Sequence, residues 1–144
     1  WITRIELIRG EHTGYWEGQG WSKEAIIKPN SRIDQPRPGM IPAGPVEIHG
    51  IAFSGPVGIA RVEVSVDDGW TWQEATLTRG PTPYVWTVWR YRWERPPAGG
   101  AVIRARVVQN DGYVQPRGRG RLLGGTFPDG TDEQHAVRVV IAAP

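Results

Sequence analysis

The sequence contains no cysteine, which excludes disulfide bonds, thiolate zinc sites, iron–sulfur clusters and a cysteine nucleophile. Because cysteine usage is what indicates an oxidising or reducing compartment, the compartment cannot be inferred from this sequence. No apolar stretch approaches the ~20 residues that a membrane span needs, so we expect no membrane contact by this chain. Residues 1–12 lack the basic and apolar regions of a signal peptide. Because the chain opens on Trp1 within a strand-like pattern, we expect a fragment of a longer protein.

A strong excess of one charge is absent as well. There are 17 Lys and Arg against 15 Asp and Glu, and the basic residues are scattered except in the Arg-Gly-Arg-Gly-Arg run at 117–121. We therefore expect no nucleic-acid partner. His12, His49 and His135 lie far apart, and no serine has a Gly-x-Ser-x-Gly setting. The sequence thus predicts neither a histidine metal site nor a hydrolase.

Glycine, proline and tryptophan are abundant, with 19, 13 and 8 copies. Short β-branched or aromatic runs punctuated by Gly and Pro are typical of all-β proteins. Asp67-Asp68-Gly69 between two such runs predicts a hairpin turn, because Asp-Gly tolerates positive φ. Strands are predicted at 46–52, 59–66, 70–77, 84–93, 101–110 and 135–141, with a broken edge strand in 31–43. This pattern indicates an immunoglobulin-like antiparallel β-sandwich.

The first forty residues are less regular. Residues 2–9 alternate apolar and polar side chains and predict a short strand, whereas 10–44 is a long connection interrupted by prolines. Aromatic residues in this connection are costly to leave in water, so we expect them to pack on their own domain or on a missing neighbour. They are Tyr15, Trp16 and Trp21. The predicted sandwich covers 40–144, after an irregular N-terminal extension over 1–39.

Three segments together resemble the dimerisation domain of the sulfite oxidase family of molybdenum-cofactor oxidoreductases. The most specific is 44–77, which is similar to that family's strand, Gly-aromatic-Ser-Gly loop, strand, Asp-Gly turn and Thr-Trp strand. The others are VWTVWRYRW at 85–93 and DGYVQP at 111–116. The positions that carry the family motifs are Asp68, Gly69, Trp72, Trp86, Trp89, Asp111, Gln115 and Pro116.

Upstream, TRIELI at 3–8, YWEGQGW at 15–21 and SRIDQPRPG at 31–39 look like the end of the family's catalytic domain and its linker. The resemblance implies a parent oxidoreductase with molybdenum held by a pyranopterin dithiolene and one protein thiolate. That thiolate would lie upstream, because this chain has no cysteine. We therefore expect no catalytic, cofactor-binding or metal-binding residue here, and a catalytic domain in the same polypeptide.

The resemblance also implies a homodimer through this domain. Trp86, Trp89, Tyr91 and Trp93 are candidates for the interface, since exposed aromatics mark contacts. The alternative interpretation is that all four are core or edge packing, because strands favour aromatics in any case.

In sulfite oxidases proper, a Trp-Asn-x-Arg-Gly segment after the Gln-Pro turn supplies an arginine to the anion pocket. This chain lacks the Trp-Asn pair there, so the role is not carried over. Arg117, Arg119 or Arg121 could contact an anion through a planar guanidinium, and a solvated basic loop is the competing interpretation. The competing function is a stand-alone β-sandwich that binds carbohydrate or protein through its tryptophans.

Overall fold

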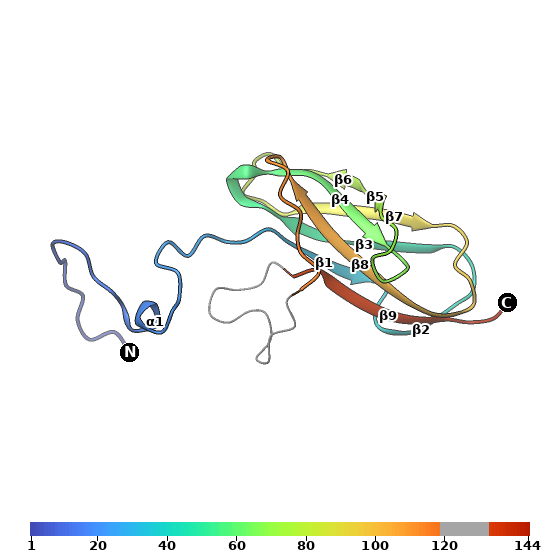
Figure 1. The fold of residues 1–144 in the computed structure, drawn as a ribbon, viewed down its shortest axis with the longest axis horizontal. Coiled ribbons are helices and arrows are strands. Elements are labelled where there is room, and N and C mark those ends of the chain that lie inside the picture. The colour runs from blue at the N-terminus through green and yellow to red at the C-terminus, as the bar shows by residue number, and fades with distance from the viewer. Residues whose placement is uncertain (119–132) are drawn as a thin grey trace.

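The computed structural model describes residues 1–118 and 133–144 and shows a two-layer β-sandwich preceded by an extended N-terminal segment (Figure 1). The four-stranded sheet has the order β1-β3-β7-β6, and the five-stranded sheet has the order β2-β9-β8-β4-β5. The elements are α1 (Tyr15–Gly18), β1 (Asn30–Gln35), β2 (Gly39–Ile41), β3 (Val46–Phe53), η1 (Gly55–Val57), β4 (Ile59–Ser65), β5 (Gln73–Glu74), β6 (Thr76–Thr78), β7 (Thr87–Trp93), β8 (Gly99–Gln109) and β9 (His135–Ile141).

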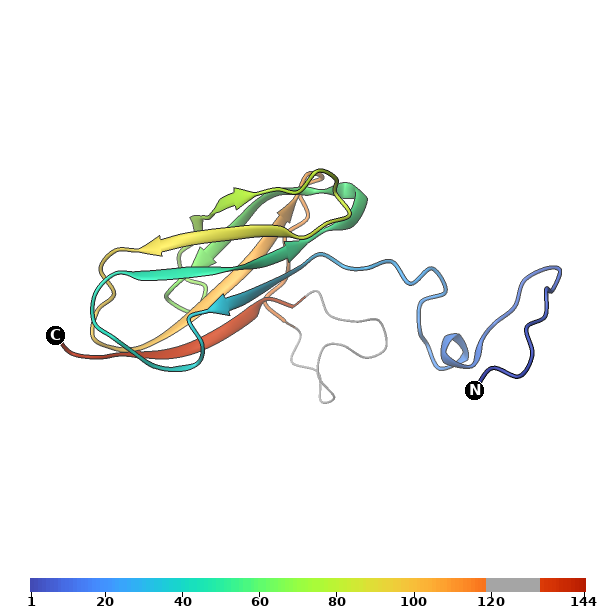
Figure 2. The same cartoon turned by 180° about the vertical axis from the view of Figure 1, so that it is seen from behind.

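The topology confirms the predicted immunoglobulin-like sandwich, with one parallel exception. All printed pairs are antiparallel except β2 with β9, where Gly39–Ile41 runs parallel to Val139–Ile141. Strands β1 and β2 follow each other in sequence but join different sheets (Figure 2). The short segment between them contains Pro36 and Pro38, which cannot donate to a ladder and so favour this crossing.

The core lies between the sheets and follows the period-2 alternation of the strands. In β7, Thr87, Trp89 and Trp93 are buried while the residues between them, apart from Tyr91, are exposed. The core otherwise consists mainly of aliphatic side chains from both sheets, including Ile48, Val62, Val64, Ile103, Val107, Val137 and Val139. Burying each such side chain contributes about 1.5–3 kcal/mol. The sandwich is therefore held together mainly by apolar contact across its two sheets.

The sandwich begins earlier than the sequence indicated. Strand β1 starts at Asn30 and pairs with β3 from Asn30↔Phe53 to Gln35↔His49, so the expected boundary at residue 40 is corrected to about residue 30. Ser31 and Ile33 are buried, so this stretch belongs to the core although Pro29 and Pro36 flank it.

Three local predictions also need correction. Residues 2–9 form no strand, because no neighbouring strand is present to pair with them. The 70–77 run is divided into β5 and β6, which join different sheets, since buried Ala75 lies at the crossing between them. The 84–93 run forms strand only from Thr87, and the 10–44 connection contains the single-turn helix α1.

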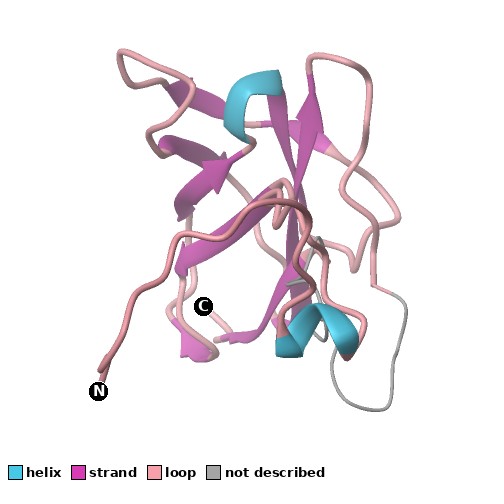
Figure 3. Cartoon of the chain, turned by 90° about the vertical axis from the view of Figure 1, so that its left-hand side faces the viewer, coloured by secondary structure: helices cyan, strands magenta, loops and turns pink. Residues whose placement is uncertain are grey.

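The strand register places four segments at one end of the sandwich, here called the N-proximal end. Asn30 is opposite Phe53, Ala52 is opposite Thr87, and Ile59 is opposite Gln109. The start of β1, the β3–β4 turn, the β6–β7 loop and the base of the β8–β9 connection therefore meet there. Figure 3 views the molecule from this end, where the chain passes from α1 into the sandwich.

Candidate interaction surfaces

The Asp67–Gly69 turn is held by a set of short hydrogen bonds. Ser65 Oγ donates to Asp67 Oδ1 over 2.6 Å, and the amide and hydroxyl of Thr71 both donate to the same carboxylate. Desolvation raises the pKa of Asp67, but the hydrogen bonds from Ser65 and Thr71 outweigh it and lower the pKa to about 2. Asp68 and Gly69 have φ values of 61° and 94°, as the sequence signal for this turn predicted.

Asp68 ties this turn to two arginines on the outer face of the five-stranded sheet. Its Oδ1 accepts from Arg104 Nε and its Oδ2 from Arg117 Nη2, each over 2.6 Å. The Arg104 hydrogen bond is the main cause that lowers the pKa of Asp68, with Arg117 adding to it. Arg117, one of the three candidate anion contacts, is therefore already paired within the chain, while Arg119 and Arg121 lie outside the described residues.

Glu63 forms a second carboxylate bridge on the same face. Its two oxygens accept from Arg61 Nε over 2.7 Å and from Arg106 Nε over 2.6 Å. Desolvation raises the pKa of Glu63, and the two arginines outweigh it and lower the pKa. The Arg106 guanidinium lies 3.9 Å from the centre of the Trp72 ring, a cation–π contact. Trp72 Nε1 in turn donates to the Gly69 carbonyl over 3.1 Å, so this motif tryptophan braces the turn.

Gln115 is a fully buried polar residue that links both sheets to the β8–β9 connection. Its Oε1 accepts from Ser31 Oγ over 2.9 Å and from the Val107 amide over 3.0 Å. Its Nε2 donates to the Glu133 carbonyl over 2.8 Å. The amide of Gln134 donates to the Pro116 carbonyl, so the two stems of the connection are also joined directly. These contacts explain why a glutamine, and not an apolar residue, occupies the position.

Asp111 completes the set of motif residues with a defined local role. Its Oδ1 accepts from the Tyr113 amide over 3.0 Å, and the Gly112 amide donates to the Gln109 carbonyl at a φ of 88° for Gly112. An Asp side chain that caps a turn two residues on is a common use of this residue type. Asp111, Gln115 and Pro116 thus shape the base of the β8–β9 connection.

The structure separates the four aromatic interface candidates. Trp89 is 0% exposed and Trp93 is 8% exposed, and both belong to the core. Tyr91 is partly buried and packs against the same core. These three lie on the inner face of β7 because they share its alternation, so their assignment to a surface contact is corrected. Trp86 precedes the strand and is 51% exposed.

Exposed aromatics that the sequence did not single out as interface residues lie elsewhere. Trp70 is 86% exposed beside the Asp67–Gly69 turn, and Tyr84 and Tyr113 are exposed in loops at the N-proximal end. No sequence signal distinguishes these from core aromatics, because each lies in an irregular segment where alternation gives no face.

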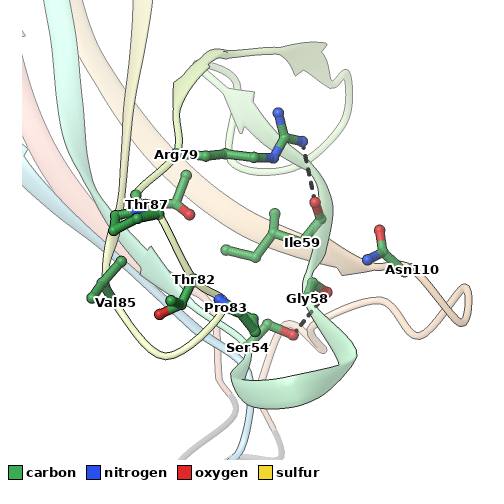
Figure 4. Close-up of a pocket in the computed structure, with 11 residues that line it drawn as sticks. Ser54, Gly58, Ile59, Arg79, Thr82, Pro83, Val85, Thr87 and Asn110 are labelled. Carbon is green, nitrogen blue, oxygen red and sulfur yellow. Dashed lines mark hydrogen bonds between the residues drawn. The ribbon is translucent and has the colours of Figure 1, made fainter.

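Two hollows lie at the N-proximal end. The first, of about 310 Å³, lies between the β3–β4 turn and the β6–β7 loop (Figure 4). Arg79 on its wall donates through Nη2 to the carbonyls of Ile59 and Ala60 over 3.2 and 3.0 Å. Ser54 Oγ donates to the Gly58 carbonyl over 3.1 Å. The polar groups of this hollow are thus largely used by the chain itself, which makes it structural packing between loops.

The second hollow is a groove of about 730 Å³ between residues 21–30 and the sandwich. Its walls are mainly apolar and include Trp21, Ile26, Ile27, Pro56 and Val57. The aromatic residues upstream contact one another: the rings of Tyr15 and Trp16 have centroids 5.1 Å apart, and those of Trp16 and Trp21 are 5.6 Å apart. Of the two predicted alternatives, packing on their own domain holds only for Trp21, which lines the groove; packing on a missing neighbour stays a prediction.

Within residues 1–118 and 133–144, no three His, Asp or Glu side chains come together as a metal site. Over the same residues, no helix has the length and apolar character needed to cross a bilayer. The described surface instead presents charged residues on the outer faces of both sheets and a number of exposed apolar side chains. Such surfaces suit contact with another polypeptide chain or domain.

Comparison with known proteins places these features in a family. Mitochondrial sulfite oxidase from Homo sapiens is 36% identical over 140 residues, covering 81% of this chain and 26% of that protein. The enzyme from Mus musculus is 36% identical over 93 residues, covering 60% of this chain and 17% of that protein. The chain thus spans about a quarter or less of the length of these relatives.

Solved structures agree. The sulfane dehydrogenase SoxCD from Paracoccus pantotrophus superposes with a TM-score of 0.59 at 28% identity, covering 81% of this chain and 33% of that chain. A fibronectin(III)-like module of Clostridium thermocellum CbhA matches with a TM-score of 0.50 at 17% identity, covering 77% of this chain and 93% of that one, and shows the fold alone. The family model described as the Mo-co oxidoreductase dimerisation domain matches residues 21–127. The chain therefore belongs to the dimerisation-domain family of molybdenum-cofactor oxidoreductases of the sulfite oxidase type.

Proposed function

We propose that this chain is the non-catalytic part of a molybdenum-cofactor oxidoreductase, in which it joins two subunits and packs on the catalytic domain of its own polypeptide. The observation that carries the proposal is the family match over residues 21–127 in a chain without cysteine. The parent enzyme would then act on a small oxo-compound, as its sulfite oxidase relatives do on sulfite. The competing binding-module function has less support, because exposed Trp70 and Trp86 lie at opposite ends of the sandwich and offer no common platform.

The residues of this domain do not fit the cofactor of its family. A molybdenum held by dithiolene sulfurs is completed by a soft protein ligand, and no residue here can supply a thiolate. Among the described acidic side chains, Glu63 and Asp68 each form ion pairs with two arginines, so their oxygens are not free to bind a metal. Any cofactor of the parent enzyme would therefore be held outside this chain.

Residues 1–29 support contact with a preceding domain. Their apolar side chains are uncovered, with Leu7 99% exposed and Ile2, Ile5, Ile26 and Ile27 also exposed. So many exposed apolar side chains in one short segment favour contact with another polypeptide. The segment joins the sandwich at the N-proximal end, where its last residues already line the groove with Pro56 and Val57. We therefore assign residues 1–29, corrected from 1–39, to the tail and linker of a preceding catalytic domain.

Hydrogen–deuterium exchange tests this assignment on the 144-residue chain and on the parent enzyme. In the isolated chain, amides of residues 1–13 should exchange within seconds, since none takes part in a described backbone hydrogen bond. In the parent enzyme the same amides should be protected. Equal exchange in both proteins would refute packing of this segment on another domain.

A second measurement addresses the division of chemistry. The isolated chain should contain no molybdenum by elemental analysis and should not oxidise sulfite, whereas the parent enzyme should contain about one molybdenum per subunit. Stoichiometric molybdenum in the purified 144-residue chain would contradict the non-catalytic assignment.

A further inference from the structure

Resting on the proposed dimerisation, the structure points to the outer face of the four-stranded sheet as the surface that a second copy of this chain covers. This outer face comprises Arg32 and Asp34 of β1, Glu47, His49, Ile51 and Phe53 of β3, and Trp86, Val88, Arg90 and Arg92 on and before β7. The ladder brings these residues side by side: Ile51 is opposite both Arg32 and Val88, His49 is opposite Arg90, and Glu47 is opposite Arg92.

An apolar patch occupies the part of this face nearest the N-proximal end. The rings of Phe53 and Trp86 are in contact, with centroids 5.4 Å apart. Ile51 and Val88 form the next cross-strand pair, and Val88 and Trp86 remain exposed. A tryptophan within an apolar patch that charged residues surround is the usual arrangement of an interface centre and its rim.

The charges on this face suit contact with an identical face. Arg32, Arg90 and Arg92 are balanced by Asp34, Glu47 and the following Glu94, and Arg32–Asp34 and Arg92–Glu94 are exposed ion pairs within the chain. In a two-fold contact the same patch is used on both subunits, so it must carry both signs to complement itself. Arg90 and Glu47 make no ion pair with any residue in the described parts of the chain. They are therefore available to partners on a second copy.

On the outer face of the five-stranded sheet the charge pairing extends to the aromatic residue. There Glu63 and Asp68 each bind two arginines, and Arg106 covers the ring of Trp72. Because Glu63 and Asp68 are satisfied within the chain and the Trp72 ring is covered, a second copy would gain little from these three residues. The groove at the N-proximal end is also separate: none of Ile51, Phe53, Trp86 or Val88 lines it. The preceding domain and the second copy thus take different surfaces.

Sedimentation equilibrium of the 144-residue chain tests the face through two exposed tryptophans. Trp86→Ser should raise the dimer dissociation constant at least tenfold, while Trp70→Ser, the matched control at the opposite end, should change it less than twofold. Arg90→Glu should also weaken the dimer, with an effect that shrinks as salt rises. Unchanged thermal melting of the Trp86→Ser chain would show that the variant is folded.

Because the chain has no cysteine, a single introduced one carries a unique spin label. Arg92→Cys labels the proposed face on β7 outside the apolar patch, and Val140→Cys labels the outer face of the five-stranded sheet. Packed sheets lie ~10 Å apart, so in the proposed dimer the two Val140 labels should be about 20 Å farther apart than the two labels at position 92. Dipolar distances in the reverse order, or a dimer indifferent to Trp86→Ser, would overturn this face alone. A chain that is monomeric at every concentration would overturn the proposed dimerisation together with it.

Discussion

Replacing Gln115 with leucine should destabilise the sandwich more than its small change in volume suggests. The side chain is 0% exposed and makes three hydrogen bonds, to Ser31, Val107 and Glu133. Leucine fills a similar space but leaves the Val107 amide and the Glu133 carbonyl without these partners. An orphaned buried polar group costs about 1–3 kcal/mol.

The hydrogen bond from the Val107 amide is buried, whereas the Glu133 carbonyl is only part-buried and can accept from water. The Val107 amide therefore sets the expected loss, about 1–3 kcal/mol in the free energy of unfolding. For a domain of this size, each kcal/mol lowers Tm by about 3–4 °C. The Gln115→Leu chain should therefore melt about 3–12 °C below the wild type in differential scanning calorimetry. Gln73→Leu, the same change on exposed β5, is the matched control and should cost less than about 0.5 kcal/mol.

The result that would refute this reasoning is a Gln115→Leu chain that melts within 2 °C of the wild type, roughly the effect expected of a surface change. Gln115→Glu separates the contributions further. It keeps an acceptor for the Val107 amide but loses the donor to the Glu133 carbonyl and buries a carboxyl group. It should therefore be destabilised at neutral pH and partly recover as the pH falls and the carboxyl is protonated.

Three further predictions concern single positions. Gly50→Ala should cost about 3 kcal/mol or prevent folding, because a Cβ there would lie 1.8 Å from the Arg32 carbonyl oxygen and 2.8 Å from Trp89 Cζ2; denaturant unfolding measures it, and a loss below 1 kcal/mol would contradict the close approach. Desolvation and the Arg32 guanidinium lower the pKa of His135, whose Nδ1 accepts from the Ile33 amide over 3.0 Å. The unfolded chain then binds the proton more readily, so stability should fall as the pH drops through 6.5 and below, and His135→Asn, which keeps an acceptor but does not titrate, should flatten the Tm profile between pH 7.5 and 5. Asp67, with its pKa lowered to about 2, should stabilise the turn above about pH 4 and lose that contribution as the pH falls toward 2; an Asp67→Asn chain with an equally steep acid loss would exclude this residue as a cause.

The β-sandwich could be predicted from the sequence because the apolar and polar side chains alternate within each strand, and this alternation does not depend on the rest of the fold. Valines at every second position of β4 and the Asp67–Gly69 turn need only local chemistry, and both were predicted correctly. Asp111 also acts locally, since it accepts from the Tyr113 amide two positions on, whereas Gln115 takes partners as distant as Ser31 and so depends on the fold. The sequence alone also excludes a thiolate ligand in this chain, because it contains no cysteine.

Only the tertiary structure decided which aromatics are buried and where the domain begins. Trp86 and Trp89 are three residues apart in one aromatic run, yet the first is exposed and the second lies in the core, because strand β7 starts between them at Thr87. Asn30–Gln35 carries prolines downstream that suggested a linker, but pairing with β3 and the buried Ser31 and Ile33 draw it into the sheet. Likewise, the pairing of Arg117 with Asp68, 49 positions away in sequence, depends on the fold that brings the two segments together. The physical reason is the same in each case. The alternation along a strand assigns side chains to two faces of a sheet, but only the packing of other segments decides which of these faces is buried.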